Sequence, residues 1–341
     1  MKPWAIVAGD PGGGSALAPV VAQMQQQGLP CRLFAYAQSA HAWRERGWVV
    51  ADAELPDLEG CAGLLCATSV NEHMFELRWL QAARQAGVAS LALLDFWSNY
   101  RARFLMGAAL CLPDRIAVPD ELARQEMLRD GFPASCLLVT GQPALDKLAH
   151  AGGLSPARRA TLRAACGVGE AEQLLLFASQ PLRMLAQQLG QHRWIDEQAA
   201  LADVEAALRE LGRPIALRVK PHPRENAADF AALGQVWANS RLAPDALAHD
   251  LLKCADIVVG IHSMLLLEAC YLGCRVLSYQ PGRWDSDPLP SNRSGLSRRC
   301  DDPAGLARAI AELLDGPAPV PPSPDGQAAQ RVLDAMHALQ G

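Results

Sequence analysis

Residues 217–230 read LRVKPHPRENAADF, and the chemistry of the chain changes abruptly inside this stretch. An apolar run, Ile215 to Val219, stops at the polar segment KPHPRE, residues 220–225. Two prolines within three residues exclude both a helix interior and a central strand, because each lacks an amide hydrogen and has a fixed φ. The stretch therefore predicts a buried strand over 215–223 whose end holds His222 rigidly among cations.

The same alternation of apolar runs and helical stretches extends along the whole chain. Continuous apolar strands separated by helices are typical of parallel sheets covered on both faces. The pattern thus predicts an α/β protein with two Rossmann-like parallel-sheet domains that face a central cleft. The predicted strands are 4–9, 31–37, 63–68, 89–96, 115–120, 136–143, 174–180, 215–223, 255–263 and 275–281. The predicted helices are 15–27, 72–86, 121–130, 156–165, 194–211, 264–272 and 303–314.

Domain boundaries follow from composition. The segment near 143–155 combines Pro, Gly and polar residues, so we expect the two halves to join there. We therefore predict an N-terminal acceptor domain over 1–148 and a C-terminal nucleotide-donor domain over 149–318. A Pro-rich tail with a short terminal helix is expected over 319–341.

Composition excludes several classes of protein. The 341 residues have a net charge of −5, so the chain lacks the basic surface that nucleic-acid binding requires. Ten cysteines occur without CxxC spacing, which favours a reducing, cytoplasmic environment and argues against structural zinc. No run approaches the roughly 18 apolar residues of a membrane span, and the N-terminus does not resemble a signal peptide.

The first candidate site is AGDPGGGSAL, residues 8–17. Gly12, Gly13 and Gly14 allow the backbone to approach a ligand closely, and the following helix offers unpaired amides. The segment matches neither the dinucleotide GxGxxG pattern nor the Walker pattern. Two interpretations remain open: a tight strand-to-helix turn, or a loop that contacts an acceptor or a phosphate.

The second candidate site is the end of the 215–223 strand. A neutral imidazole at His222 can donate to a phosphate oxygen, and Lys220 and Arg224 increase the preference for an anion. The alternative is a histidine in a structural hydrogen bond. Rigid placement between two prolines favours the phosphate interpretation.

The third candidate site lies in VVGIHSMLLLEACYLGCRVLSY, residues 258–279. Ser263 is expected to cap a helix, with Gly273 just beyond the helix end. Ser263 and the amide of Met264 then form an anion site at the helix N-terminus. Glu268 is a carboxylate on an otherwise apolar helix, so we expect it either in a structural salt bridge or bound to ribose hydroxyls.

The stretch LLDFWSNYRARF, residues 93–104, is the remaining candidate. Asp95 ends a strand and can act as general base for an acceptor hydroxyl; Asp10 and Glu72 are equal alternatives. Trp97, Tyr100 and Arg101 follow, and aromatic rings beside polar groups suit contact with an acceptor sugar. A packed loop explains the same composition equally well.

These motifs together carry a resemblance. The link GQPALD (141–146), the KPHP strand end and the serine-led helix with Glu268 resemble GT-B-fold glycosyltransferases. They are especially similar to bacterial sialyl- and polysialyltransferases and CDP-glycerol glycerophosphotransferases, and UDP-N-acetylglucosamine 2-epimerases share the fold. One departure is that Met264 and Leu265 stand where the epimerases have Gly-Gly after the serine.

The resemblance implies a metal-independent glycosyltransferase that moves a sugar from a nucleotide-activated donor to an acceptor hydroxyl, in cell-surface or secondary glycan synthesis such as polysaccharide biosynthesis. His222 and the helix start would hold the donor phosphates, and Glu268 the ribose. No cofactor is expected beyond the nucleotide-sugar co-substrate, and its partner is a glycan or small-molecule acceptor. A sugar-nucleotide 2-epimerase and a non-catalytic sugar-nucleotide-binding protein are the alternatives. Peripheral membrane association and the oligomeric state stay open.

Overall fold

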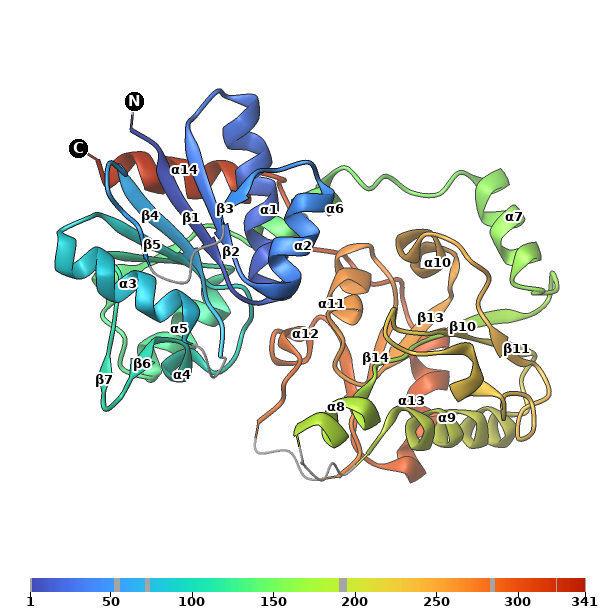
Figure 1. Ribbon diagram of the computed structural model, residues 1–341. Helices are drawn as coiled ribbons and strands as arrows, with labels where there is room; N and C mark the ends of the chain where they lie inside the picture. The colour runs from blue at the N-terminus through green and yellow to red at the C-terminus, as the bar shows by residue number, and fades with distance from the viewer. Residues whose placement is uncertain are drawn as a thin grey trace. The chain divides into compact units, whose positions relative to one another are not determined.

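The computed structural model describes residues 2–51, 56–70, 74–189, 195–282, 286–322 and 324–340. The chain divides into two compact units (Figure 1). Unit 1 comprises residues 1–150 and 324–341, and unit 2 comprises residues 151–323. The terminal helix therefore belongs to unit 1, whereas the sequence had suggested a separate tail over 319–341.

Unit 1 is built on a seven-stranded sheet in the order β3-β2-β1-β4-β5-β8-β9, and every neighbouring pair is parallel. A separate antiparallel pair, β6 and β7, lies outside this sheet. The strands of the unit are β1 (Trp4–Ala8), β2 (Cys31–Ala35), β3 (Val50–Ala51), β4 (Gly63–Ala67), β5 (Ser90–Leu93), β6 (Leu105–Met106), β7 (Ala109–Leu110), β8 (Arg115–Val118) and β9 (Leu137–Val139).

Helices cover both faces of this sheet. Trp4, Ile6 and Ala8 of β1 share a buried cluster with residues of α1, α2 and α14. On another strand Phe34 packs against Trp79 of α3, with ring centroids 4.5 Å apart. The helices of the unit are α1 (Pro11–Gln26), α2 (Ala37–Glu45), α3 (Phe75–Ala86), α4 (Tyr100–Phe104), α5 (Glu121–Arg129), α6 (Asp146–Ala149) and α14 (Ala328–Ala338).

The GQPALD segment anchors the terminal helix to unit 1. The carboxylate of Asp146 accepts hydrogen bonds from the backbone N–H groups of Ala328 and Ala329, at 3.0 and 2.8 Å, and so caps α14. Gly141 has a φ of +90°, and a Cβ there would lie 2.8 Å from the Cβ of Ala328. A glycine is therefore required both by the backbone conformation and by the close approach of α14.

Unit 2 contains a six-stranded parallel sheet in the order β12-β11-β10-β13-β14-β15. Its strands are β10 (Gln173–Ala178), β11 (Ile215–Lys220), β12 (Ser240–Leu242), β13 (Ile257–Gly260), β14 (Val276–Tyr279) and β15 (Arg298–Cys300). Its helices are α7 (Pro156–Ala165), α8 (Leu182–Leu189), α9 (Glu197–Leu211), α10 (Ala248–Cys254), α11 (Met264–Tyr271), α12 (Pro290–Arg293) and α13 (Pro303–Asp315).

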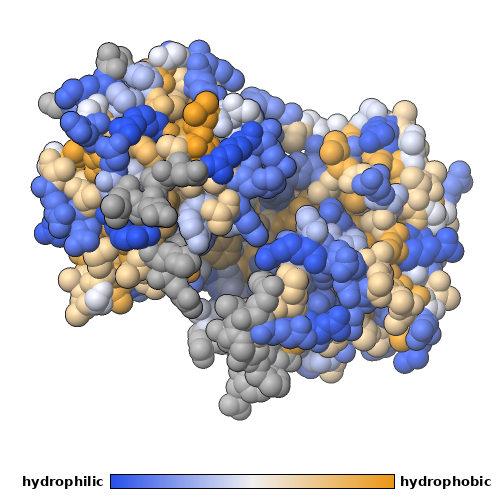
Figure 2. Space-filling view, in the orientation of Figure 1, coloured by the Kyte–Doolittle hydropathy of each residue, from blue (hydrophilic) through white to orange (hydrophobic). Residues whose placement is uncertain are grey.

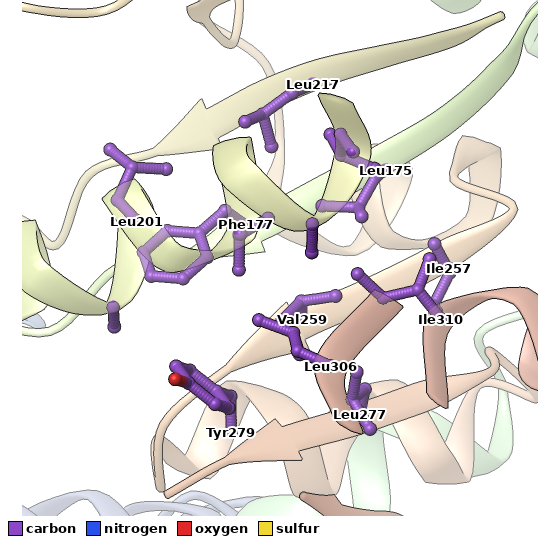
Figure 3. Close-up of a cluster of buried hydrophobic side chains, with 14 of the residues drawn as sticks. Leu175, Phe177, Leu201, Leu217, Ile257, Val259, Leu277, Tyr279, Leu306 and Ile310 are labelled. Carbon is purple, nitrogen blue, oxygen red and sulfur yellow. The ribbon is translucent and has the colours of Figure 1, made fainter. Parts of the chain in front are cut away.

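Alternate residues of the strands in unit 2 enter two different cores. Leu175 and Phe177 of β10 join residues of α9 and α13 on one face (Figure 3). Leu174 and Leu176 of the same strand join residues of α7, α10 and α11 on the other face. A strand that is buried on both faces therefore appears in the sequence as a continuous apolar run, which is how β10 was predicted.

The strand order places a topological switch point in each sheet. In unit 1 the order reverses between β1 and β4, and in unit 2 between β10 and β13. Loops leaving two such neighbouring strands diverge to opposite sides, and ligands of open α/β sheets bind in the crevice left outside the carboxyl ends. The predicted α/β class with two parallel-sheet domains is confirmed, although most strands end two or more residues before their predicted boundary.

Other sequence-based expectations concern the surface and the thiols. All ten cysteines are free, and nine of them are buried. Among the described residues, no helix is long and apolar enough to cross a membrane. Figure 2 shows hydrophilic residues over much of the visible surface, with hydrophobic residues between them.

Candidate functional site

The switch point of unit 2 is bridged by a side-chain amide. Gln180 follows β10, and its Oε1 accepts a hydrogen bond from the backbone N–H of His262, at 2.8 Å. The Nε2 of Gln180 also lies 3.3 Å from Nδ1 of the His262 ring. The loop after β10 is thereby tied to the loop after β13, which leads to Ser263.

A carboxylate ties the KPHP turn to the same strand end. Glu225 accepts a hydrogen bond from the backbone N–H of His222 at 2.6 Å, and another from the hydroxyl of Ser179 at 2.8 Å. Ser179 follows β10 directly, and its backbone N–H donates to the carbonyl of Lys220. Burial raises the pKa of Glu225, although both hydrogen bonds act in the opposite direction. The turn is therefore fixed to the neighbouring strand as well as by its prolines.

The protonation and tautomer of His222 follow from its surroundings. Nδ1 of the ring accepts a hydrogen bond from the backbone N–H of Arg224, at 3.1 Å. Burial lowers the pKa of His222, and the positive charges of Arg224 and Lys220 lower it further. The ring is thus neutral at pH 7, and its proton is on Nε2, because Nδ1 is an acceptor. A neutral Nε2–H group is a hydrogen-bond donor of the kind that a phosphate oxygen accepts.

The predicted cap of α11 is confirmed. The hydroxyl oxygen of Ser263 accepts a hydrogen bond from the backbone N–H of Leu265, at 3.1 Å. Gly273 follows the helix end with a φ of +76°, as its predicted position requires. Met264 is the first helical residue, so its backbone N–H belongs to the amides that an α-helix leaves without an intrahelical partner. Ser263 and Met264 therefore lie where the predicted anion site requires them.

Glu268 has a partner that the sequence analysis did not identify. Its Oε2 lies 2.6 Å from Nε2 of His249 on α10, and the two side chains are 18% and 27% exposed. A structural partner, which one of the two interpretations of Glu268 requires, is thus present in unit 2, and the contact is a salt bridge when His249 is protonated. Binding of ribose hydroxyls by Glu268 stays a prediction.

The three glycines of unit 1 do not form a loop. Helix α1 begins at Pro11, so Gly12, Gly13 and Gly14 make up its first turn. A Cβ at Gly13 would lie 2.5 Å from the Cβ of Ala67, and a Cβ at Gly14 would lie 2.8 Å from Oγ of Ser39. Close packing of the helix start therefore explains these two buried residues.

Gly12 is exposed, but its nearest side-chain neighbour is an acid. A Cβ at Gly12 would lie 2.8 Å from Oδ2 of Asp95. A carboxylate this close opposes a bound phosphate by charge repulsion. The glycines thus serve the packing of α1, and contact of Gly12, Gly13 and Gly14 with an acceptor or a phosphate stays a prediction.

The switch point of unit 1 is bridged by a carboxylate, Glu76 of α3. Its Oε1 accepts a hydrogen bond from the backbone N–H of Gly9 at 2.7 Å, and its Oε2 accepts one from the hydroxyl of Ser69 at 2.5 Å. Gly9 follows β1 and Ser69 follows β4, so Glu76 joins the two strands at which the order reverses. The side chain is 4% exposed, and burial raises its pKa.

Asp95 lies at the same edge of the sheet, after β5. Its Oδ1 forms a 2.5 Å ion pair with the guanidinium of Arg103 and accepts a hydrogen bond from the hydroxyl of Thr68. Burial raises the pKa of Asp95, whereas the positive charge of Arg103 lowers it. The negative charge of Asp10 raises the pKa of both Asp95 and Glu76. Three carboxylates therefore lie near one another at the carboxyl edge of unit 1.

Trp97 and Tyr100 have structural partners inside the unit. Trp97 is 2% exposed, and its indole N–H donates to Asp120 at 2.7 Å. Tyr100 is 6% exposed, and its hydroxyl donates to Glu126. We therefore correct the expectation that these rings contact an acceptor, because burial leaves neither ring face accessible.

Of the last two candidate residues of unit 1, the structure describes Arg101 but not Glu72. Arg101 is exposed, and its guanidinium donates to the backbone carbonyl of Asp130 at 2.9 Å; its contact with an acceptor stays a prediction. Glu72, the third candidate base, lies outside the described residues.

The sequence contains an Asp-Ser-Asp triplet at 285–287, whose carboxylates are possible ligands of a metal ion. This triplet therefore has to be compared with the expectation that the reaction needs no metal. Residue 285 lies outside the described part of the chain. Asp287 accepts hydrogen bonds from the side chains of Gln280, Asn292 and Arg299, at 3.1, 2.9 and 3.3 Å. Within the described ranges, no three His, Cys, Asp or Glu side chains are grouped so as to hold a metal ion.

Several residues of the site were absent from the sequence-based candidates. Glu76, Gln180, Glu225, His249 and His262 all connect one strand end or helix to another. Only Glu225 carried a local indication, because it stands three residues after His222. The remaining contacts join residues that are between 7 and 82 positions apart in the chain, so no local pattern identifies them.

Comparison with known proteins places the fold. No protein-family model matches the chain, and neither does any curated protein. Solved structures do match over nearly the whole length, and they have a GT-B-like fold of two parallel-sheet α/β domains. The expected resemblance to this group of folds is thus confirmed.

Three of these structures illustrate the range of enzymes that share the fold. UDP-GlcNAc 2-epimerase from Neisseria meningitidis, bound to UDP-GlcNAc, is 12% identical with a TM-score of 0.66, and the match covers 98% of this chain and 100% of that chain. The epimerase from Methanocaldococcus jannaschii is 12% identical with a TM-score of 0.65, covering 98% and 99%. A spinosyn rhamnosyltransferase complexed with thymidine diphosphate is 14% identical with a TM-score of 0.57, covering 98% and 96%. Identities this low establish the shared fold alone.

Proposed function

We propose that this protein is a glycosyltransferase that uses a nucleotide-activated sugar as donor and an acceptor hydroxyl as nucleophile. Unit 2 binds the donor through its diphosphate, and unit 1 binds the acceptor and supplies a carboxylate base. The departing diphosphate is stabilised by the Nε2–H group of His222, by Lys220 and Arg224, and by the amide at the start of α11.

One observation supports this proposal above the others. Hydrogen bonds tie the KPHP turn through Glu225 to Ser179, and the next residue in the chain, Gln180, is hydrogen-bonded to the loop before Ser263. The two elements that the sequence indicated as phosphate ligands are thus connected across three neighbouring strands. Preorganised donors of this kind stabilise developing charge without reorganising during the reaction.

The acids of unit 1 suit a different task. Asp10, Glu76 and Asp95 repel a phosphate, but a carboxylate is able to accept the proton of an attacking hydroxyl. Asp95 is the base that we favour, because Arg103 and Thr68 hold its Oδ1 while its Oδ2 faces the start of α1. Asp10 is the alternative base.

A sugar-nucleotide 2-epimerase is the second candidate. It is favoured by the solved epimerases with this fold, whose TM-scores exceed that of the spinosyn rhamnosyltransferase. The Met264-Leu265 pair after Ser263 argues against it. The third candidate is a protein that binds sugar nucleotides without turning them over. An assay that detects no nucleotide release would favour it.

The test has two steps. Calorimetry with UDP, CDP, CMP, GDP and TDP should identify one nucleotide that binds, and His222→Ala should weaken that binding. The matching nucleotide sugar is then incubated with and without an acceptor mixture, and the products are identified by NMR. Acceptor-dependent release of the nucleotide supports transfer, whereas a change at sugar C2 without acceptor identifies an epimerase. Absence of binding by every nucleotide contradicts the whole proposal.

We further propose that the reaction needs no metal ion, because Lys220, Arg224 and the helix amides supply the positive charge. Activity should then persist in EDTA. Inhibition that magnesium or manganese reverses would show that a cation is required.

A further inference from the structure

The carboxyl edge of unit 1 carries an apolar surface. Tyr36, Val70 and Met74 are 47%, 53% and 43% exposed. Tyr36 follows β2, while Val70 and Met74 follow β4, so all three lie at the edge where Asp10 and Glu76 are found. Other aromatic residues of this unit, such as Phe34, Trp43 and Trp79, are buried. We call Tyr36, Val70 and Met74 the apolar patch.

The backbone beside the patch is strained. Ala37 has a φ of +46° and Met74 a φ of +47°, a left-handed conformation that residues with a Cβ rarely adopt. Asn99, which precedes α4 at the same edge, has a φ of +56°. Unfavourable backbone conformations of this kind concentrate at ligand sites, because the surrounding structure must hold them in place. Here they occur at the residue after Tyr36 and at Met74 itself.

The patch adjoins the polar groups of the switch point. The backbone N–H of Tyr36 donates to the carbonyl of Ala8, and its ring centroid lies 6.0 Å from that of Phe75. Phe75 precedes Glu76, whose carboxylate binds the hydroxyl of Ser69 directly before Val70. An apolar surface and carboxylates therefore share a single loop cluster, which suits a ligand that has an apolar part and a hydroxyl.

We propose that the acceptor of this enzyme carries an aryl or alkyl group, which binds to the apolar patch while its hydroxyl lies toward the carboxylates. The assignment as acceptor rests on the proposed function, whereas binding of the apolar group does not. The apolar group contributes affinity because it removes the ring of Tyr36 and the side chains of Val70 and Met74 from water. A small amphiphile fits better than a protein, because stable protein interfaces bury about 800 Å² on each partner and the patch consists of three side chains.

The test uses ligand-observed saturation-transfer NMR on the full chain. Phenyl β-glucoside and n-octyl β-glucoside, the latter below its micellar concentration, are compared with methyl β-glucoside, which has the same sugar. The phenyl and octyl protons should receive saturation, and Tyr36→Ala should weaken their binding about tenfold. Val70→Thr and Met74→Gln, which keep the side-chain shape, should each reduce binding. Val49→Thr changes a side chain that is 90% exposed elsewhere in unit 1, and should have no effect.

Two results of the NMR experiment overturn the inference. One is equal saturation of the methyl and phenyl compounds. The other is unchanged binding in a Tyr36→Ala protein whose melting temperature is normal. Sedimentation of wild type and Tyr36→Ala adds a third: a dimer that the substitution dissociates would show that the patch binds a second copy of the chain.

Nucleotide calorimetry on the same samples separates this inference from the proposed function. Patch variants should bind the nucleotide as wild type does. If wild type binds the phenyl compound but no nucleotide, the proposed function fails and the apolar binding site remains. If wild type binds a nucleotide but no apolar compound, the inference fails alone.

Discussion

The two sheets share the strand order around their switch points but differ in the side chain that bridges each switch point. In unit 1 the switch point between β1 and β4 is bridged by the carboxylate of Glu76, with Asp10 and Asp95 close by. In unit 2 the switch point between β10 and β13 is bridged by the neutral amide of Gln180, with Lys220, His222 and Arg224 on the neighbouring strand end.

This difference teaches that strand order alone does not define a phosphate site. Both switch points are followed by a helix, and both have the backbone geometry that favours ligand binding. The acids of unit 1 make its crevice repel anions, whereas the cations and the helix start of unit 2 attract them. We therefore propose that the donor binds unit 2, and the following predictions test that contrast.

The largest expected effect is on turnover in unit 2. His222→Ala should lower kcat by about 10²–10³-fold, because it removes a preorganised donor to the departing diphosphate. Steady-state kinetics with a circular dichroism check of folding measures this. His41→Ala, on an exposed side chain of α2, is the matched control. Near-normal kcat in a folded His222→Ala protein would remove His222 from the mechanism.

The next effect is on the stability of unit 1. Gly13→Val places a side chain where Ala67 already packs, so we expect a loss of about 1–3 kcal/mol in the free energy of unfolding. Chemical denaturation measures it, with Gly152→Val as control, since a Cβ at Gly152 has no atom within 4 Å. A stable Gly13→Val protein that has lost nucleotide binding would instead identify the glycine turn as the phosphate site and reverse the assignment of the units.

A smaller effect concerns the helix carboxylate of unit 2. Glu268→Gln should weaken nucleotide binding about tenfold, because hydrogen bonds from ribose hydroxyls to a charged acceptor are stronger than those to an amide. The melting temperature should change little, since Gln can still accept a hydrogen bond from His249. Calorimetry and thermal melting decide between the two roles. Unchanged affinity with a clearly lower melting temperature would assign Glu268 to the structural salt bridge alone.

The smallest effect should appear as a pH dependence in unit 1. The folded-state pKa of Glu76 is raised, so its contribution to stability is present below the unfolded pKa and is lost as pH rises through the folded pKa. Glu76→Gln removes this loss, because Gln can accept from Gly9 and donate to Ser69. Each unit of raised pKa corresponds to about 1.4 kcal/mol.

Thermal melting between pH 4 and 8 measures this difference. The variant should be more stable than wild type at pH 7–8, and the advantage should disappear near pH 4. A variant that is less stable than wild type at every pH would show that the charged form of Glu76 stabilises the unit.

Several features of this protein were determined by the sequence alone. Runs such as LLLF (174–177) and IALRV (215–219) predicted the buried parallel strands, because residues buried on both faces leave no polar alternation. The two prolines around His222 and the serine before Met264 predicted a strand end and a helix start from local backbone constraints. These are interactions within a few residues, which a sequence displays directly.

Only the tertiary structure decided what the glycines, the aromatic rings and the carboxylates do. The glycines after Asp10 looked like a ligand loop, yet Ala67 and Ser39 require them for packing from more than twenty residues away. The sequence suggested that Trp97 contacts a sugar, but in the structure its indole N–H donates a hydrogen bond to Asp120. Glu76 gave no sign of its position between Gly9 and Ser69, because β1 and β4 become neighbours only when the sheet reverses its strand order. Charge and burial at a strand end depend on which other strands lie beside it, and that adjacency is a property of the folded sheet.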